Sequence, residues 1–356
     1  MGLEAHAPMI KYIGSKRALL PWILGTIEKI HAITPLRRAV DLFSGSARVG
    51  HALKARGFYV IANDHATYAY VLAQALIEAD ARAYPPQALA PILARLMALK
   101  PQPGWFTQVY CHEARYFHPK NGARIEAIRT AIEAYEDPRL RAILLTSLLL
   151  AADRVDSTTG IQMAYLKRWA PRAHRDLCLA YPPLLPGAGE AHQADALALA
   201  EGLSADLFYL DPPYNQHAYL GNYHVWETLV RFDRPRTYGV ARKRSDVQSR
   251  KSPFNSRKEA RGALERLLAS IKAPHLLLSF NDEGFFQAQE IEAMLADWGF
   301  VVRLSRPYRR YVGARIGIYN PRGEKVGRVS HTENHEFLFV ATQHRRVYQA
   351  LRACAG

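Results

Sequence analysis

Cysteine is scarce in this 356-residue chain, which has three cysteines and no Cys-x-x-Cys pair. Cys111, Cys178 and Cys354 lie far apart in sequence, so neither a zinc site nor a disulfide framework is expected. No apolar run reaches the length of a membrane-spanning helix, and the longest candidate, residues 142–152, is typical of a buried helix. The first nine residues lack a basic region followed by an apolar core, so we expect no secretory signal. These absences favour a protein of the reducing cytoplasm.

Acidic residues are also in the minority, with 32 Asp and Glu against 47 Lys and Arg. The formal net charge of +15 favours an anionic partner, and nucleic acid is the first expectation. The alternative is that the charge serves only solubility. Hydrophobic residues make up 49% of the chain and charged residues 22%, which excludes a disordered protein.

Short apolar runs followed by polar loops dominate the pattern of the chain. They cover residues 39–43, 58–62 and 207–210, and helical patterns follow the first two at 49–57 and 68–79. Strands that alternate with helices indicate a doubly wound, mostly parallel α/β sheet of Rossmann-like type.

Carboxylates stand where these predicted strands end. Ligands of such sheets bind at the carboxyl ends of the strands, where Asp41, Asp64 and Asp211 are expected to meet. Two later apolar runs, 275–280 and 336–341, read as further strands.

A long insert separates the second and third strands. Helical patterns cover residues 87–99, 124–135 and 138–152. A stretch of this length is a subdomain rather than a loop. We therefore expect a catalytic domain formed by residues 1–79 and 190–356, with residues 80–189 as an inserted, mainly helical subdomain.

Basic residues crowd the stretch 231–261, where they are interrupted by Pro and Ser. This pattern predicts a flexible positive loop that binds a phosphate backbone, and Lys251 is our candidate contact within it. The alternative is a solvated surface loop. The basic residues are Arg231, Arg234, Arg236, Arg242, Lys243, Arg244, Arg250, Lys251, Arg257, Lys258 and Arg261.

The third strand ends in Asp211-Pro212-Pro213-Tyr214, a combination that suits chemistry on an amine attached to a flat ring. Such an amine is a weak nucleophile because its lone pair is delocalised into the ring. A carboxylate and a backbone carbonyl that accept its two hydrogens stabilise the charge that develops on nitrogen during attack. Successive prolines hold the carbonyls rigidly, and the tyrosine ring can stack on a base. The alternative is an ordinary Asp-Pro turn.

The loop 41–46 has one glycine, Gly45, and therefore differs from the three-glycine dinucleotide fingerprint. Gly45 allows the backbone to approach a ligand closely. Asp64 follows at a distance that suits an acid accepting the two hydroxyls of a ribose. The alternative for Asp64 is a helix cap.

These segments resemble the Dam-type, alpha-group N6-adenine DNA methyltransferases, most of all the modification enzymes of type IIS restriction systems. Residues 11–16, Lys-Tyr-Ile-Gly-Ser-Lys, resemble the N-terminal cofactor motif of that family, and 278–281 resemble the strand that walls its target pocket. The resemblance implies a class I methyltransferase sheet, S-adenosylmethionine as cofactor, and the tetrapeptide Asp211, Pro212, Pro213 and Tyr214 as the catalytic motif. It also implies that the cofactor-binding residues are Tyr12, Gly14, Lys16, Asp41, Phe43, Gly45, Asp64 and Asp195.

The same resemblance makes the insert a target-recognition subdomain for duplex DNA. Candidate DNA contacts are Lys11, Lys167, Arg168, Asn222, Tyr223, His224 and Lys251. Within 164–169, the aromatics Tyr165 and Trp169 suit base or backbone contact. Their four-residue spacing equally fits two side chains that pack along one face of a helix.

The resulting expectation is site-specific methylation of the N6 amine of an adenine flipped out of duplex DNA, without a covalent enzyme intermediate or a metal. A cognate restriction endonuclease acting separately is the expected partner, and no membrane partner is expected. The alternative is a ribosomal RNA N6-adenine methyltransferase, which shares the fold and a similar tetrapeptide. Less favoured alternatives are protein-glutamine, N4-cytosine and C5-cytosine methyltransferases, whose motifs differ, and a non-catalytic DNA-binding protein.

Overall fold

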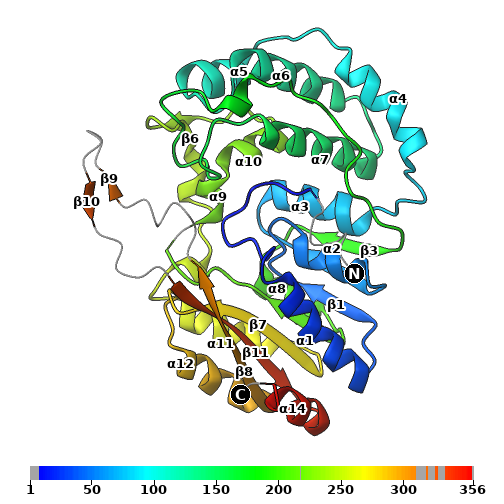
Figure 1. Cartoon of the computed structure of the whole chain (residues 1–356), viewed down its shortest axis with the longest axis vertical. Helices are drawn as coiled ribbons and strands as arrows, with labels where there is room; N and C mark the ends of the chain where they lie inside the picture. The colour runs from blue at the N-terminus through cyan, green and yellow to red at the C-terminus, as the bar shows by residue number, and fades with distance from the viewer. Residues whose placement is uncertain (1–7, 217, 310–317, 320–324, 328–332, 355–356) are drawn as a thin grey trace.

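The structure, a computed structural model, describes residues 8–216, 218–309, 318–319, 325–327 and 333–354. Its centre is a seven-stranded sheet in the order β3-β2-β1-β4-β7-β11-β8 (Figure 1). The first five strands pair in parallel, and β11 pairs antiparallel with both β7 and β8. The strands span Arg38–Asp41 (β1), Tyr59–Asn63 (β2), Gly189–His192 (β3), Leu207–Leu210 (β4), His275–Asn281 (β7), Phe300–Arg309 (β8) and Glu333–Thr342 (β11). The predicted Rossmann-like α/β class is confirmed.

The central strands form because their side chains are apolar on both faces of the sheet. Every residue of β4 and β7 is buried. Successive residues of β4 alternate between two apolar clusters: Leu207 and Tyr209 join one, and Phe208 and Leu210 join the other. This two-sided burial is typical of parallel strands covered by helices on both faces.

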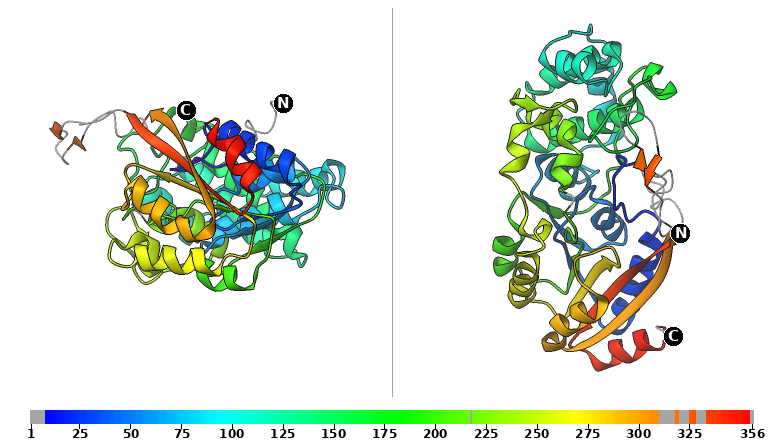
Figure 2. Two further views of the ribbon diagram at one scale, coloured as in Figure 1. Left: turned by 90° about the horizontal axis from the view of Figure 1, so that it is seen from below. Right: turned by 90° about the vertical axis from the view of Figure 1, so that its left-hand side faces the viewer.

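Helices cover each face of the sheet. One face packs against α8 (Ala196–Gly202), α11 (Ala260–Ser270) and α12 (Ala288–Leu295). The other packs against α1 (Leu20–Ile33), α2 (Arg48–Lys54), α3 (Thr67–Ala73) and α14 (Arg345–Arg352). The two sets of helices are seen on opposite sides of the sheet in the left view of Figure 2. The π-helix η2 (Gln74–Glu78) and the 3₁₀-helix η7 (Ala296–Trp298) extend α3 and α12.

The chain between η2 and β3 is mainly helical as far as Arg154 and mostly irregular after it, and its helices lie at one end of the molecule (Figure 1). The three predicted helices appear as α4 (Pro86–Met97), α6 (Pro119–Ile132) and α7 (Pro138–Arg154). Shorter turns are α5 (Trp105–Thr107), η3 (Gln108–Glu113) and η4 (Pro171–His174). The insert helices share one apolar cluster with the sheet and α3, so their division into a separate subdomain stays a proposal.

The basic stretch after residues 211–214 has more structure than the predicted flexible loop. It includes the end of α10 (His224–Arg231), the hairpin of β5 (Thr237–Tyr238) and β6 (Lys243–Arg244), and the turns η5 (Ser245–Gln248) and η6 (Pro253–Asn255). The short helix α9 (Tyr219–Asn222) precedes α10. A separate pair, β9 (Ile318–Tyr319) and β10 (Lys325–Gly327), lies apart from the main sheet. Within the described ranges, no helix is both long and apolar enough to span a bilayer.

Candidate active site

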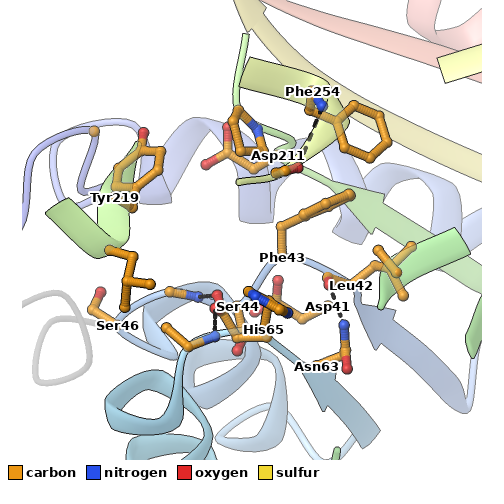
Figure 3. Close-up of a pocket in the computed structure, with 18 of the residues that line it drawn as sticks. Asp41, Leu42, Phe43, Ser44, Ser46, Asn63, His65, Asp211, Tyr219 and Phe254 are labelled. Atoms are coloured by element: carbon orange, nitrogen blue, oxygen red, sulfur yellow. Dashed lines mark hydrogen bonds between the residues drawn. The ribbon is translucent and has the colours of Figure 1, made fainter. Parts of the chain in front are cut away.

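A cavity opens at the carboxyl ends of β1, β2 and β4, where the predicted acidic residues were expected to meet. Figure 3 shows Asp41 and Phe43 on one side of this space, with Asp211, Tyr219 and Phe254 around the remainder. Residues from the N-terminal segment and from 250–255 complete the wall. The lining includes Tyr12, Gly14, Lys16, Asp41, Phe43, Gly45, Asp64, Asp195, Asp211, Pro213 and Lys251 from the sequence-based candidates.

The loop after β1 is held close to the N-terminal segment. Gly45 has a φ of +51°, and a Cβ atom placed there would lie 3.1 Å from the ring of Tyr12. Tyr12 in turn stacks between Tyr219 and Tyr223, with ring centroids 5.3 and 4.7 Å away. A glycine is therefore needed at position 45 both for the backbone angle and for the approach of this aromatic stack.

Two carboxylates, the buried Asp41 and the partly buried Asp64, organise the loops at the cavity floor. Asp41 Oδ2 accepts a hydrogen bond from the Gly50 amide at 2.9 Å, and burial raises the pKa of Asp41 to about 7. Asp64 accepts from the amides of Gly45 and Ala66, each at 2.9 Å, and its pKa is also raised by burial. Asp64 thus joins the two loops, and its remaining lone pairs leave it able to accept hydroxyl hydrogen bonds.

Asp195 lies at the rim of the cavity and is exposed. Its side chain caps α8 by accepting hydrogen bonds from the amides of Leu197 and Ala198. The capping role accounts for an aspartate at this position without a ligand.

The carboxylate at the end of β4 forms an ion pair across the cavity. Asp211 Oδ1 lies 2.9 Å from Nζ of Lys16, which is 5% exposed. Burial raises the pKa of Asp211, and the adjacent ammonium of Lys16 opposes that rise. Burial alone would lower the pKa of Lys16, but Asp211 raises it above its ordinary value. Lys16 therefore stays charged and favours the ionised form of Asp211.

The rest of the tetrapeptide is packed behind Asp211. Pro212 and Tyr214 are buried and do not belong to the cavity lining, whereas Pro213 does. The Tyr214 hydroxyl accepts a hydrogen bond from Asn281 at 3.0 Å, and its ring lies 5.1 Å from that of Phe280. The end of β7 therefore supports the motif from behind, while residues 278–281 do not line this cavity, so their role as a wall of the target pocket stays a prediction.

The candidate DNA contacts differ in accessibility. Lys167, Arg168 and Lys251 are exposed. Lys11 is half-buried and pairs with Asp153 and Asp156.

By contrast, Asn222, Tyr223 and His224 are 7%, 1% and 0% exposed. His224 donates from Nε2 to the Gln162 carbonyl at 2.8 Å, and burial lowers its pKa to about 3. In this arrangement protein covers all three side chains: His224 packs against the insert and Tyr223 stacks on Tyr12, so their contact with DNA stays a prediction.

The segment 164–169 is irregular rather than helical. Tyr165 and Trp169 therefore do not pack along one face of a helix, which was the alternative explanation of their spacing. Tyr165 lies edge-on to Tyr116 with centroids 5.6 Å apart, and Trp169 lies 5.5 Å from the ring of His118. Both aromatics are only partly buried.

Several arginines of the basic stretch are engaged within the protein. Arg244 is 1% exposed and bonds to Asp233 at 2.6 Å and Asp246 at 2.9 Å. Arg250 bonds to the fully buried Glu227 at 2.7 Å. The basic residues of this stretch that are exposed include Arg234, Arg236, Lys251, Arg257 and Lys258.

Sequence reasoning missed cavity-lining residues whose position depends on the fold. Arg48 stands two residues after the loop 41–46, and Phe254 comes from the basic stretch, far from the strand ends in sequence. The signal for Arg48 was its nearness to Gly45. For Phe254 there was none, because only the fold of η6 brings it to the cavity. Among the described residues, no group of three or more His, Cys, Asp or Glu could hold a metal ion.

The sequence is similar to those of several known methyltransferases. Type II methyltransferase M.NlaIII of Neisseria lactamica is 30% identical over 85% of this chain and 92% of its own length. Modification methylase StsI of Streptococcus sanguinis is 30% identical over 86% of this chain, and type II methyltransferase M.FokI of Planomicrobium okeanokoites is 31% identical over 85%. In these two relatives the match spans half of their length. Residues 12–294 match the D12 methyltransferase family, and the chain therefore belongs to the D12 class of N6 adenine-specific DNA methyltransferases.

Proposed function

We propose that this enzyme transfers a methyl group from S-adenosylmethionine to the N6 amine of an adenine flipped out of duplex DNA, at a specific sequence. The observation that supports this most strongly is the placement of Asp211 on the same cavity as the loop 41–46 and Asp64. A nucleoside cofactor held by the loop and Asp64 has its reactive end toward the Asp211 motif.

The residues of the cavity fit the proposed cofactor chemically. Asp64 is placed to accept the ribose hydroxyls, and the half-buried ring of Phe43 offers an apolar face for the adenine. Arg48 contributes buried guanidinium nitrogens without a partner, which suit an anionic group. We assign Tyr12, Gly14 and Lys16 to binding of the amino acid end of the cofactor. Asp41 and Gly45 belong to the loop that receives the cofactor, and Asp195 is assigned to the adenine of the cofactor at the rim of the cavity. When bound, S-adenosylmethionine supplies an electrophilic methyl group.

The chain's own part in the reaction is to make the amine of adenine a better nucleophile. Asp211, kept ionised by Lys16, accepts one amine hydrogen, and the Pro212 carbonyl accepts the other. Pro213 fixes the backbone of the motif. We assign the Tyr214 ring, supported by Phe280 and Asn281, to stacking on the flipped base, which requires the side chains that now cover this ring to move. Attack is direct, so no side chain is needed as a covalent nucleophile.

We further propose that residues 80–189 read the target sequence, and that Lys167, Arg168 and Lys251 contact DNA because they are exposed and positive. Lys11 joins them if DNA displaces its pairing with Asp153 and Asp156. The relatives are named as type II methyltransferases and modification methylases. By that likeness we propose a restriction-modification role, with a cognate endonuclease acting as a separate protein.

Expression in a host without adenine methylation tests this proposal. Sequencing that detects modified bases should find N6-methyladenine within one short target sequence, and the Asp211→Ala variant should leave the DNA unmodified. Modified cytosine in place of adenine, or methylation by the Asp211→Ala variant, would contradict the assignment of the site.

A further inference from the structure

Arg48 is buried in the wall of the candidate active site without a partner. It begins α2, directly after the loop that follows β1, and lines the cavity. The residue is 6% exposed, and its Nε and Nη1 atoms are buried and make no hydrogen bond. A charged donor taken out of water without an acceptor costs free energy, so such a group in a native fold calls for a ligand or another explanation.

The other cations around this cavity already have a partner or lie in solvent. Lys16 is paired with Asp211, and Arg250 is paired with Glu227. Lys251 is exposed at the edge. Of the described residues that line the cavity, Arg48 is thus the cation with buried nitrogens that lack an acceptor.

The surroundings of Arg48 define the kind of anion it can accept. It also borders a second cavity, which is lined by residues 9–19 together with Gly160 and Glu336. Burial lowers the pKa of Arg48 to about 10 and Arg17 acts in the same direction, so the guanidinium remains charged at neutral pH. A small carboxylate carried by a ligand within the candidate active-site cavity can reach it, because Arg48 lines that cavity.

We propose that Arg48 binds the carboxylate of the methionine part of S-adenosylmethionine, while Lys16 remains with Asp211. This inference rests on the proposed function, because it requires that cofactor in the cavity. It changes the assignment of Lys16, which then serves mainly to hold the charge of the catalytic carboxylate. Lys16 and Arg48 thereby have separate anions.

Calorimetric titration with two ligands tests the inference without relying on turnover. The ligands are S-adenosylhomocysteine and its decarboxylated analogue, which carries a 3-aminopropyl group in place of the amino acid. In Arg48→Met the dissociation constant for S-adenosylhomocysteine should rise about 10- to 100-fold, as expected for a lost charge-assisted hydrogen bond. The constant for the decarboxylated analogue should stay within about twofold of the wild-type value for that analogue. Arg346→Met, the same change at an exposed position on α14, should leave both unchanged.

The unliganded protein gives an independent measurement. Arg48→Met removes an unpaired buried charge, so its melting temperature without ligand should equal or exceed that of the wild type. The increase in melting temperature caused by S-adenosylhomocysteine should shrink.

Three outcomes would overturn the inference. Equal loss of affinity for both ligands would mean that Arg48 only shapes the cavity. Unchanged affinity for S-adenosylhomocysteine, combined with weaker duplex binding, would assign Arg48 to a DNA phosphate. Failure of the wild-type protein to bind S-adenosylhomocysteine at all would refute the proposed cofactor itself, and this inference with it.

Discussion

Asp211 is the residue on which the proposed chemistry depends. Its carboxylate faces the cavity and is paired with Lys16, whereas Pro212 and Tyr214 lie behind it. An amide at this position keeps the shape but lacks the negative charge that stabilises the attacking amine. We expect Asp211→Asn and Asp211→Ala to reduce the methyl-transfer rate by about 100-fold or more, the loss typical of one electrostatic group in an active site.

The control for Asp211 is binding. Both variants should bind S-adenosylhomocysteine within a few-fold of the wild type, because Asp64 and the loop 41–46 are unchanged. Near-normal turnover in Asp211→Asn would refute the catalytic assignment, and loss of ligand binding would show that Asp211 holds the cofactor instead.

The buried His224 is expected to lower the stability of the folded protein in acid. Burial lowers its pKa in the folded protein to about 3, whereas an unfolded histidine titrates near 6.5. Below about pH 6.5 the unfolded chain therefore binds a proton that the folded chain does not, so stability falls as the pH is lowered. His224→Gln keeps a donor for the Gln162 carbonyl but cannot be protonated. Between pH 6 and 4, the free energy of unfolding of the variant should fall by about 1.4 kcal/mol less per pH unit than that of the wild type.

Urea unfolding at several pH values measures this difference. Asp41 and Asp153 have folded-state pKa values raised to about 7 and about 6. Their protonation therefore stabilises the fold as the pH is lowered, which is opposite to the effect of His224 on the wild type. Both are present in the variant too, and comparing the two proteins at each pH therefore isolates His224. Parallel pH profiles would contradict the neutral, buried state of this ring.

At the scale of elements, Glu227 joins α10 to α3 and to the wall of the cavity. Its buried carboxylate accepts from Thr67 Oγ1 at 2.8 Å, from the Tyr68 amide at 3.1 Å and from Arg250 at 2.7 Å. Glu227→Ala leaves the half-buried Arg250 without this partner, and the free energy of unfolding should fall by about 3–5 kcal/mol.

A milder variant separates the ion pair from the hydrogen bonds. Glu227→Gln retains an acceptor for Thr67 or Tyr68, so we expect a smaller loss of stability than in Glu227→Ala. Denaturant titration measures both, and Glu265→Ala, at an exposed position on α11, is the control. Equal stability of Glu227→Ala and the wild type would show that this junction does not hold the elements together.

The elements that the sequence predicted best are those whose local pattern decides their environment. β4 and β7 are apolar runs buried on both faces, and the helices α4, α6 and α7 appear close to their predicted positions. β3 was missed because its residues, Gly-Glu-Ala-His, are only partly buried at the sheet edge and have no apolar pattern. The eight candidate cofactor residues all line one cavity. The strand ends of a parallel sheet meet at one edge, which brings Asp41, Phe43, Gly45 and Asp64 together, whereas Tyr12, Gly14 and Lys16 reach the cavity from the N-terminal segment.

Predictions that depended on polar character alone were less informative. Asn222, Tyr223 and His224 suit DNA contact by residue type, but the packing of α9, of α10 and of the residue between them buries their side chains. Arg244 reads as a free cation in a basic stretch, yet Asp233 and Asp246 enclose it. Charge pairs of this kind depend on the three-dimensional path of the chain, which residue spacing does not give.

The whole molecule is elongated, with the helical insert at one end and α14 at the other (Figure 2). Its net charge of +15 predicts strongly salt-dependent DNA binding. The affinity for duplex DNA should fall at least about tenfold between 50 and 200 mM salt, as counterions are released from the phosphates. Fluorescence anisotropy with a labelled duplex measures this dependence.

The exposed basic residues near the cavity should account for part of that dependence. Changing Lys251, Arg257 and Lys258 together to Gln should reduce the slope of log affinity against log salt by about 2–3. Changing the exposed residues Arg345 and Arg346 of α14, at the end of the molecule away from the helical insert, should not alter it. An unaltered slope in the triple variant would make 251–258 an ordinary surface rather than a phosphate-binding one.

The most direct test of the whole account offers duplex DNA and ribosomal RNA side by side to the enzyme with labelled S-adenosylmethionine, followed by nucleoside analysis. The account predicts N6-methyladenine in the DNA, no label in the RNA, and no product with Asp211→Asn. Label in RNA alone would contradict the proposed substrate, and methylated cytosine would contradict the proposed chemistry of Asp211.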